Sequence, residues 1–283
     1  MKLGFVSPNT PRDVDPGELA VELQSRGFES MWVGEHPKIP VASREQFPGA
    51  MPDWLPHMWD PLMALLVAAR ATTTLVVGTA VALPLEHELF TFAKQVATLD
   101  VMSGGRLVLG VGVGFRPELE LVGRFAWAGR YRALGEMIAA LGALWRDDEA
   151  HFHGEFFDFE PVWSYPKPVQ RPHPPLLAAT TGARATRACL GWADGWIPGD
   201  AAIPDLATAV TDVRRDAEDA GRDPDALDLT IMAWGDPRVE RLARYRELGF
   251  HRVILGGGRR DADDPATALP FLDRYAAMVD ELA

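Results

Sequence analysis

Short runs of apolar residues recur along the whole chain, and each is followed by a longer stretch with helical spacing. The apolar runs are rich in Val, Leu and Ile and are continuous, which is typical of strands in a parallel sheet buried on both faces. We therefore predict eight strands, at residues 3–6, 30–34, 75–82, 106–112, 175–178, 195–197, 227–233 and 252–255.

A helix is predicted after each of these strands. The first begins at the N-cap residue Asp15, has Pro16 in its first turn and ends at Gly27. The others are predicted at residues 60–71, 89–102, 130–145, 182–191, 203–220, 237–248 and 267–282. Eight strand–helix repeats in 283 residues favour a (β/α)8 TIM barrel, with a doubly wound α/β sheet as the alternative.

The domain organisation follows from the absence of a linker in this pattern. No stretch has a linker composition, so residues 1–283 are predicted to form one domain. Two interruptions, 37–59 and 147–174, are rich in Pro, His and aromatic residues and are predicted to be loop insertions. In a (β/α)8 barrel the catalytic groups lie at the C-terminal ends of the strands and in the loops that follow them.

Composition and charge exclude several classes of partner. The chain has 28 Lys and Arg against 40 Asp and Glu, a formal charge of −12, which argues against a nucleic-acid or anionic-membrane partner. The single cysteine, Cys189, excludes an internal disulfide and a multi-cysteine zinc site. The sequence shows no secretory signal and no uncharged apolar run of the roughly 18 residues that a transmembrane helix needs. We expect a cytoplasmic protein.

Polar residues after the second predicted strand are the first candidates for chemistry. His36 follows Glu35 there, and a histidine at a strand end can contact a cofactor ring or act as a general acid or base. The alternative is a histidine that only caps the strand end. His151 and His153 have metal-like spacing but no third ligand, so a surface hairpin is favoured and no metal site is predicted.

Two glycine-containing segments suggest a ligand. Gly110, Gly112 and Gly114 lie at a strand end and allow close approach of a flat ligand, although small residues for helix packing are the alternative. Thr181, Gly182 and Arg184 lie between a strand and a helix. Free N–H groups at the helix start and the guanidinium would bind a phosphate there, the alternative being an ordinary N-cap beside a surface arginine.

Five segments in order resemble one family. They are WVGEH at 32–36, VGTAV at 77–81, residues 93–100, SGGRLVLGVG at 103–112 and DGW at 194–196. Together they are similar to the bacterial luciferase-like oxidoreductases, particularly the branch that uses the deazaflavin coenzyme F420. The resemblance extends along the whole chain. It implies a (β/α)8 barrel that holds a flavin or deazaflavin ring at its mouth.

The resemblance also implies roles for individual residues. His36 matches a histidine that contacts the ring and in some relatives serves as an acid, and the Ala80–Val81 bond matches a non-proline cis peptide behind the ring. The predicted cofactor-binding residues are Glu35, His36, Ala80, Val81, Leu83, Val113, Gly114 and, in the segment that matches the cofactor-phosphate site, Thr181, Gly182, Arg184 and Ala185.

On the predicted substrate side of the site, the sequence differs from that of some relatives. Sugar-phosphate dehydrogenases of the family carry a catalytic glutamate where this chain has Phe115, which makes sugar oxidation doubtful and the substrate side apolar. The long loop with Trp54, His57 and Trp59 suggests a lid over an apolar or aromatic substrate. The alternative is that these residues only cover the barrel and a dimer seam.

The predicted function is an F420-dependent oxidoreductase that exchanges hydride at the deazaflavin C5 with a small organic molecule. An FMN-dependent monooxygenase that uses oxygen is the sister hypothesis. A non-catalytic flavin- or F420-binding protein, and a cofactor-free lyase or metal hydrolase using Glu35, His36 and His57, are alternatives from other classes. A homodimer is expected from the resemblance alone.

Overall fold

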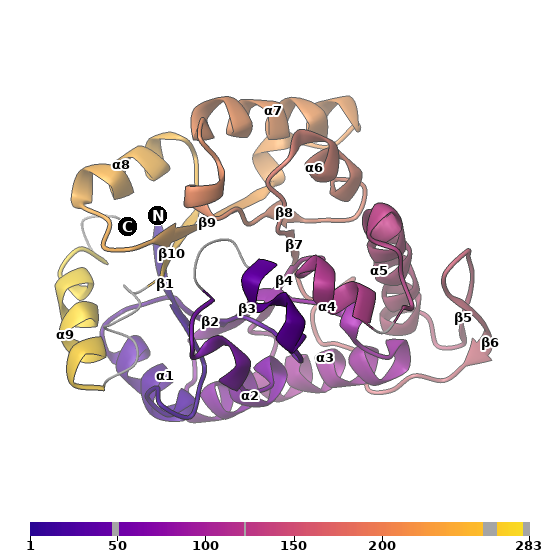
Figure 1. Ribbon diagram of the computed structural model, residues 1–283, viewed down its shortest axis with the longest axis horizontal. Helices are drawn as coiled ribbons and strands as arrows, with labels where there is room; N and C mark the ends of the chain where they lie inside the picture. The colour runs from indigo at the N-terminus through magenta and orange to yellow at the C-terminus, as the bar shows by residue number, and fades with distance from the viewer. Residues whose placement is uncertain (47–50, 122, 257–264, 280–283) are drawn as a thin grey trace.

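Eight parallel strands close into a barrel, and helices surround it, in the computed structural model of the protein (Figure 1). The structure describes residues 1–46, 51–121, 123–256 and 265–279. The strand order around the barrel is β1-β10-β9-β8-β7-β4-β3-β2, and β1 pairs in parallel with both β10 and β2. The predicted barrel is therefore confirmed, and its closure excludes the doubly wound sheet.

The barrel strands lie close to the positions that the apolar runs predict. Their bounds are β1 (Lys2–Ser7), β2 (Ser30–Val33), β3 (Val76–Ala82), β4 (Leu107–Val111), β7 (Leu176–Ala178), β8 (Gly195–Trp196), β9 (Asp228–Trp234) and β10 (Arg252–Gly256). The longer helices are also near their predicted positions: α1 (Pro16–Ser25), α2 (Pro61–Ala71), α3 (Leu89–Ser103), α5 (Arg130–Arg146), α6 (Ala183–Cys189), α7 (Leu206–Asp219), α8 (Val239–Glu247) and α9 (Pro265–Ala276).

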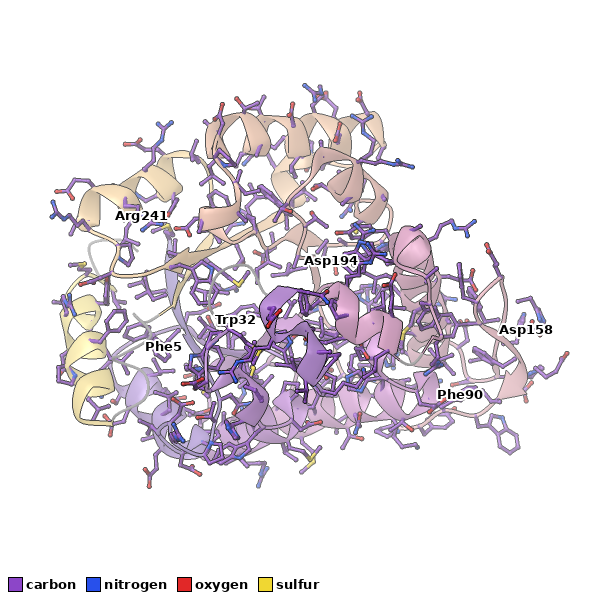
Figure 2. All side chains as sticks on the ribbon, in the orientation of Figure 1. Phe5, Trp32, Phe90, Asp158, Asp194 and Arg241 are labelled. Atoms are coloured by element: carbon purple, nitrogen blue, oxygen red, sulfur yellow. The ribbon has the colours of Figure 1, made fainter. Side chains whose placement is uncertain are left out.

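Three elements add to the predicted pattern. A short helix, α4 (Arg116–Leu121), follows β4, and the sequence pattern does not predict it. The insertion at 147–174 contains an antiparallel hairpin of β5 (Ala150–His153) and β6 (Asp158–Val162), which projects beside α5 away from the barrel (Figure 1). His151 and His153 lie on this hairpin, as expected, and His153 contacts Asp158, labelled in Figure 2.

Two helices begin with the same pair of residues, an N-cap Asp followed by Pro. Asp15 accepts hydrogen bonds from the N–H groups of Gly17 and Glu18 at the start of α1, and Asp60 accepts one from Met63 at the start of α2. In each case proline occupies the first helical position, where the missing N–H would have no partner in the helix. The N-cap predicted at Asp15 is thereby confirmed.

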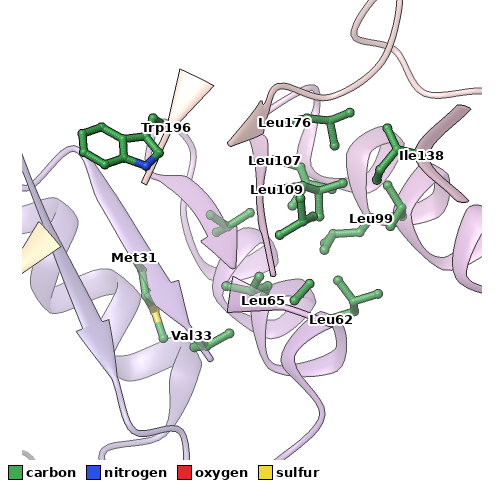
Figure 3. Packing of buried hydrophobic residues seen from close by; sticks show 14 of the residues in the cluster. Met31, Val33, Leu62, Leu65, Leu99, Leu107, Leu109, Ile138, Leu176 and Trp196 are labelled. Carbon is green, nitrogen blue, oxygen red and sulfur yellow. The ribbon is translucent and has the colours of Figure 1, made fainter. Parts of the chain in front are cut away.

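Most of the core lies between the strands and the helices. Leu107, Leu109 and Leu176 point outward from β4 and β7 and pack among side chains of α2, α3 and α5 (Figure 3). Their partners include Leu62, Leu65, Leu99 and Ile138. A second cluster, with Val108 and Leu177, fills the barrel interior. Because both faces of the sheet are buried, the strand sequences are continuously apolar.

Trp32 fills the N-terminal end of the barrel interior (Figure 2). Its indole is fully buried because Gly4 and Gly78 have no side chains, and a Cβ at Gly78 would lie 2.5 Å from the indole ring. The Arg252 guanidinium lies 5.5 Å from the Trp32 ring centroid. Open space in the barrel is therefore left at its C-terminal end, where the site is expected.

Candidate active site

A cavity of about 940 Å³ opens at the C-terminal ends of the barrel strands. This volume is at the upper end of the roughly 300–1,000 Å³ typical of ligand pockets. Its walls come from the ends of β1, β2, β3, β4, β7, β9 and β10 and from the loop after β2. Apolar groups make up most of its surface, so the few polar side chains in it are informative.

The structure brings many of the predicted site residues to this cavity. Those that line it are Glu35, His36, Trp54, Ala80, Val81, Leu83, Val113, Gly114 and Thr181. Those that do not are Phe115, His57, Trp59, Gly182, Arg184 and Ala185. His57 and Trp59 are exposed on the outer side of the loop, and Leu55 and Met58 line the cavity beside Trp54 instead.

His36 is paired with a carboxylate that the sequence pattern does not reveal. The Nδ1 atom of His36 lies 2.9 Å and 3.1 Å from the two carboxylate oxygens of Glu118 in α4. The Glu118 side chain is fully buried, whereas His36 reaches the cavity. An ionised carboxylate only accepts hydrogen bonds, so His36 donates from Nδ1 and its other nitrogen, Nε2, is left for a ligand.

Glu35 uses its carboxylate to hold the loop after β3. One oxygen accepts a hydrogen bond from the Leu83 N–H at 2.7 Å, and the other lies 2.7 Å from Nε2 of His87. Burial lowers the pKa of His87, but the hydrogen bond and charge of Glu35 outweigh this and raise it above the ordinary value. Glu35 therefore shapes the cavity wall, since both of its oxygens are engaged by protein groups.

The wall formed by β3 and β4 is apolar. The peptide bond between Ala80 and Val81 is cis, as the resemblance implies. Gly112 lies against Val81, and a Cβ at Gly112 would come within 2.8 Å of the Val81 side chain. Gly114 has a φ of 69°, a left-handed conformation that favours glycine, where the chain turns toward α4.

Arg130 is a second polar residue that sequence reasoning missed. It lies at the N-terminus of α5, with its guanidinium 4.0 Å from the Trp127 ring centroid and 4.6 Å from that of Tyr131. All three residues line the cavity. Nη1 donates to the Trp127 carbonyl, but the buried Nε has no hydrogen-bond partner among the described residues. Because Arg130 lines the cavity, its guanidinium is the candidate partner for an anionic group of a ligand.

The loop between β7 and α6 forms the neighbouring wall. Thr180 is buried, with its hydroxyl 2.7 Å from that of Thr186 and its carbonyl accepting from the Trp196 indole at 3.0 Å. Thr181 lines the cavity, whereas Gly182 and Arg184 are exposed in the following turn. Within the described ranges no group of three or more His, Cys, Asp and Glu side chains is arranged to hold a metal ion.

The family profile described as luciferase-like monooxygenase matches residues 10–267, which is most of the chain. The protein belongs to this family. An uncharacterized protein of Mycobacterium tuberculosis is 38% identical to it over 293 aligned positions, covering 99% of each chain. The resemblance inferred from the five sequence segments is therefore confirmed.

Solved structures share the luciferase-like fold over the full chain. The monooxygenase RslO1 from Streptomyces bottropensis superposes with a TM-score of 0.80 at 19% identity, covering 100% of both chains. An F420-dependent secondary alcohol dehydrogenase, solved with an F420–acetone adduct, gives a TM-score of 0.77 at 16% identity, with 100% and 99% covered. At these identities the likeness establishes the fold, and the luciferase-like neighbours differ in chemistry.

Proposed function

We propose that this luciferase-like protein is an F420-dependent oxidoreductase that acts on an uncharged, mainly apolar organic molecule. The observation that carries the proposal is His36, which presents Nε2 to the cavity while buried Glu118 holds Nδ1. Hydride transfer to or from a carbon that bears oxygen or nitrogen is accompanied by a proton transfer. A positioned imidazole beside an apolar cavity can hold or release that proton.

The residues around the cavity fit a deazaflavin. The apolar wall of Ala80, Val81 and Val113 suits one face of a tricyclic ring. At the β7 side, the guanidinium of Arg130 and the backbone of Thr181 suit the phosphate end. When bound, F420 supplies hydride chemistry at C5, and the protein positions the ring and excludes water.

The phosphate is proposed to lie between α5 and the first turn of α6. Gly182, Arg184 and Ala185 remain part of this proposal, because they follow Thr181 directly in the chain. Arg130 has the better position, since it lines the cavity while Arg184 is exposed to solvent. A charge that is partly removed from water contributes more to phosphate binding than an exposed one.

Titration of purified protein with F420 and with FMN tests the proposal. F420 fluorescence polarisation should rise with saturation, and the Arg130→Ala variant should bind F420 at least about tenfold more weakly. Arg132→Ala, an exposed arginine two residues further along α5 that does not line the cavity, is the matched control. FMN binding without F420 binding would replace the proposal with a luciferase-like monooxygenase, and binding of neither would reject both.

We also propose that two copies associate through α2 and α3. These helices lie side by side along one side of the barrel (Figure 1), and their outer face carries apolar side chains that are 39–51% exposed: Met63, Val67, Phe90, Val101 and Met102. A shallow depression of about 320 Å³ lies between the two helices. Such a patch is typical of a protein interface.

Sedimentation velocity tests this association. The wild-type protein should sediment with twice the chain mass, and the Met63→Asp variant should sediment with the mass of one chain, 31.0 kDa. A monomeric mass for both proteins would contradict the proposal.

A further inference from the structure

Trp234 occupies the side of the cavity opposite the proposed cofactor wall. It is the last residue of β9, it lines the cavity and it is 46% exposed. In the closed ring of eight strands β9 is third in order and β3 is seventh, so the two are four strands apart in both directions. Trp234 therefore lies across the barrel mouth from the Ala80–Val81 segment at the end of β3.

Two glycines provide the space in which the indole lies. A Cβ at Gly256, the end of β10, would come within 2.7 Å of the indole Cε3. A Cβ at Gly199, just after β8, would lie 3.2 Å from Nε1. Gly199 has a φ of −85°, which any residue adopts, so a side chain there would crowd the indole without straining the backbone. The indole is thus supported along its length by backbone.

The backbone of Trp234 is also held in place. Its N–H donates to Asp200 at 3.3 Å, and its carbonyl accepts from Arg241, labelled in Figure 2, at 3.2 Å. Asp200 in turn accepts a hydrogen bond from the Tyr245 hydroxyl at 2.6 Å and pairs with Arg241. These contacts join the ends of β8 and β9 to α8, so the backbone that carries the indole is held in place before any ligand arrives.

The surroundings of Trp234 are apolar. On this side the cavity wall includes Gly256 from the end of β10 and Val6 and Pro8 from the end of β1, the next two strands around the barrel from β9. Among the described wall residues from β1, β9 and β10, Ser7 is the one with a hydroxyl or charged side chain, and its hydroxyl accepts a hydrogen bond from the Asn9 N–H. Among the described wall residues of these three strands, a ligand group meets no charged side chain.

From these contacts we infer that Trp234 is the platform of a substrate subsite for an uncharged, planar aromatic ring. The ring would lie between the indole and the cofactor bound at the β3–β4 wall, so this inference rests on the proposed function. An indole face favours a flat π-system over a puckered saturated ring of the same size. The cavity volume of about 940 Å³ accommodates this second ring beside a cofactor.

A matched pair of probes tests the subsite. 2-Naphthol and decahydro-2-naphthol share one carbon skeleton and one hydroxyl, but only the first is flat. Calorimetric titration into the F420-loaded protein, and into the protein alone, should show 2-naphthol binding about threefold to tenfold more tightly. Trp234→Ala should remove this preference, and Gly256→Ala should reduce it because its Cβ displaces the indole.

Controls separate this subsite from the fold and from the cofactor. Trp163→Ala removes an indole that is 78% exposed and far from the cavity wall, and it should leave the preference unchanged. Thermal unfolding checks that Trp234→Ala is folded. Equal binding of the two probes, or a preference that survives in folded Trp234→Ala, would overturn the inference. So would a loss of F420 affinity in Trp234→Ala with the probe preference intact. Failure of the wild-type protein to bind F420 would instead reject the proposed function.

Discussion

Glu118 holds His36 through an ionic hydrogen bond in which the carboxylate is fully buried. This contact favours the tautomer with the proton on Nδ1, whereas a free imidazole exchanges between both nitrogens. The role of His36 in the proposed chemistry therefore depends on Glu118, which acts as a positioning residue and does not itself line the cavity.

Replacement of Glu118 should change the tautomer of His36. In Glu118→Gln the amide oxygen can still accept from Nδ1, so the tautomer should persist. In Glu118→Leu it should be lost, and turnover of any substrate that exchanges a proton at Nε2 should fall by about 10²-fold or more. Nitrogen-15 NMR of labelled histidines measures the tautomer, and His153 on the exposed hairpin serves as an internal control. An unchanged His36 spectrum in Glu118→Leu would contradict the assignment.

His36 was predictable because it directly follows an apolar strand, whereas Glu118 and Arg130 were not. Glu118 comes three residues after Phe115, in a six-residue helix whose start has no distinctive sequence signal. In the sequence, Arg130 is the first residue of a predicted amphipathic helix. Its position at the cavity follows only from the fold. The absence of a glutamate at Phe115 made sugar oxidation doubtful and the substrate side apolar, whereas Glu118, three residues later, contacts His36 without lining the cavity.

Among the elements, the N-terminal ends of the strands are joined by one buried cation. Arg252 at the start of β10 donates to both oxygens of Glu29 at 2.7 and 2.8 Å, to Asp228 at 3.2 Å and to Thr230 at 2.9 Å. These partners lie just before β2 and within β9. Burial raises the pKa of Glu29, but the hydrogen bond and charge of Arg252 outweigh this, so the pKa is lowered.

Arg252→Met should therefore destabilise the barrel in a pH-dependent way. Removing one partner of a buried pair costs about 3–5 kcal/mol, because Glu29 keeps its charge without its partner. The pKa of Glu29 is lower in the folded protein than in the unfolded chain. The ionised carboxylate therefore stabilises the fold at pH values above the ordinary pKa range of a carboxyl group, and this stabilisation is lost as the pH falls. The free energy of unfolding in urea should thus differ most between wild type and variant at pH 7 and less near pH 4. Arg244→Met, an exposed arginine, should cost under about 1 kcal/mol.

Most of the helices and strands could be predicted from the sequence. Continuous apolar runs indicated the barrel strands, and the Asp15 cap with Pro16 marked the start of α1. The strand β8 is only Gly195–Trp196, and its prediction rested on the apolar residues around it. The hairpin β5–β6 was expected only as a surface feature, because its strands alternate irregularly between exposed and half-buried positions and carry little periodic signal.

At the scale of the molecule, eight repeats predicted a barrel but did not settle its closure. An open sheet and a closed barrel use the same strands, and they differ in whether β1 pairs with β10. That pairing joins Lys2 to Arg252 and has no local sequence signature. The likeness of five segments to one family favoured a closed barrel at the sequence level. The pairing of β1 with β10 confirms that the barrel is closed.

The pairing of β1 with β10 has a consequence for how the protein is made. The ribosome releases β1 first and β10 last among the barrel strands, so β1 keeps an unpaired edge through nearly all of synthesis. A chain that stops before residue 252 leaves β1 and β9 with one open edge each, and open edges promote aggregation. Translation stalled late in the message should therefore yield insoluble protein, and chaperones that bind nascent chains should have their greatest effect before β10 emerges.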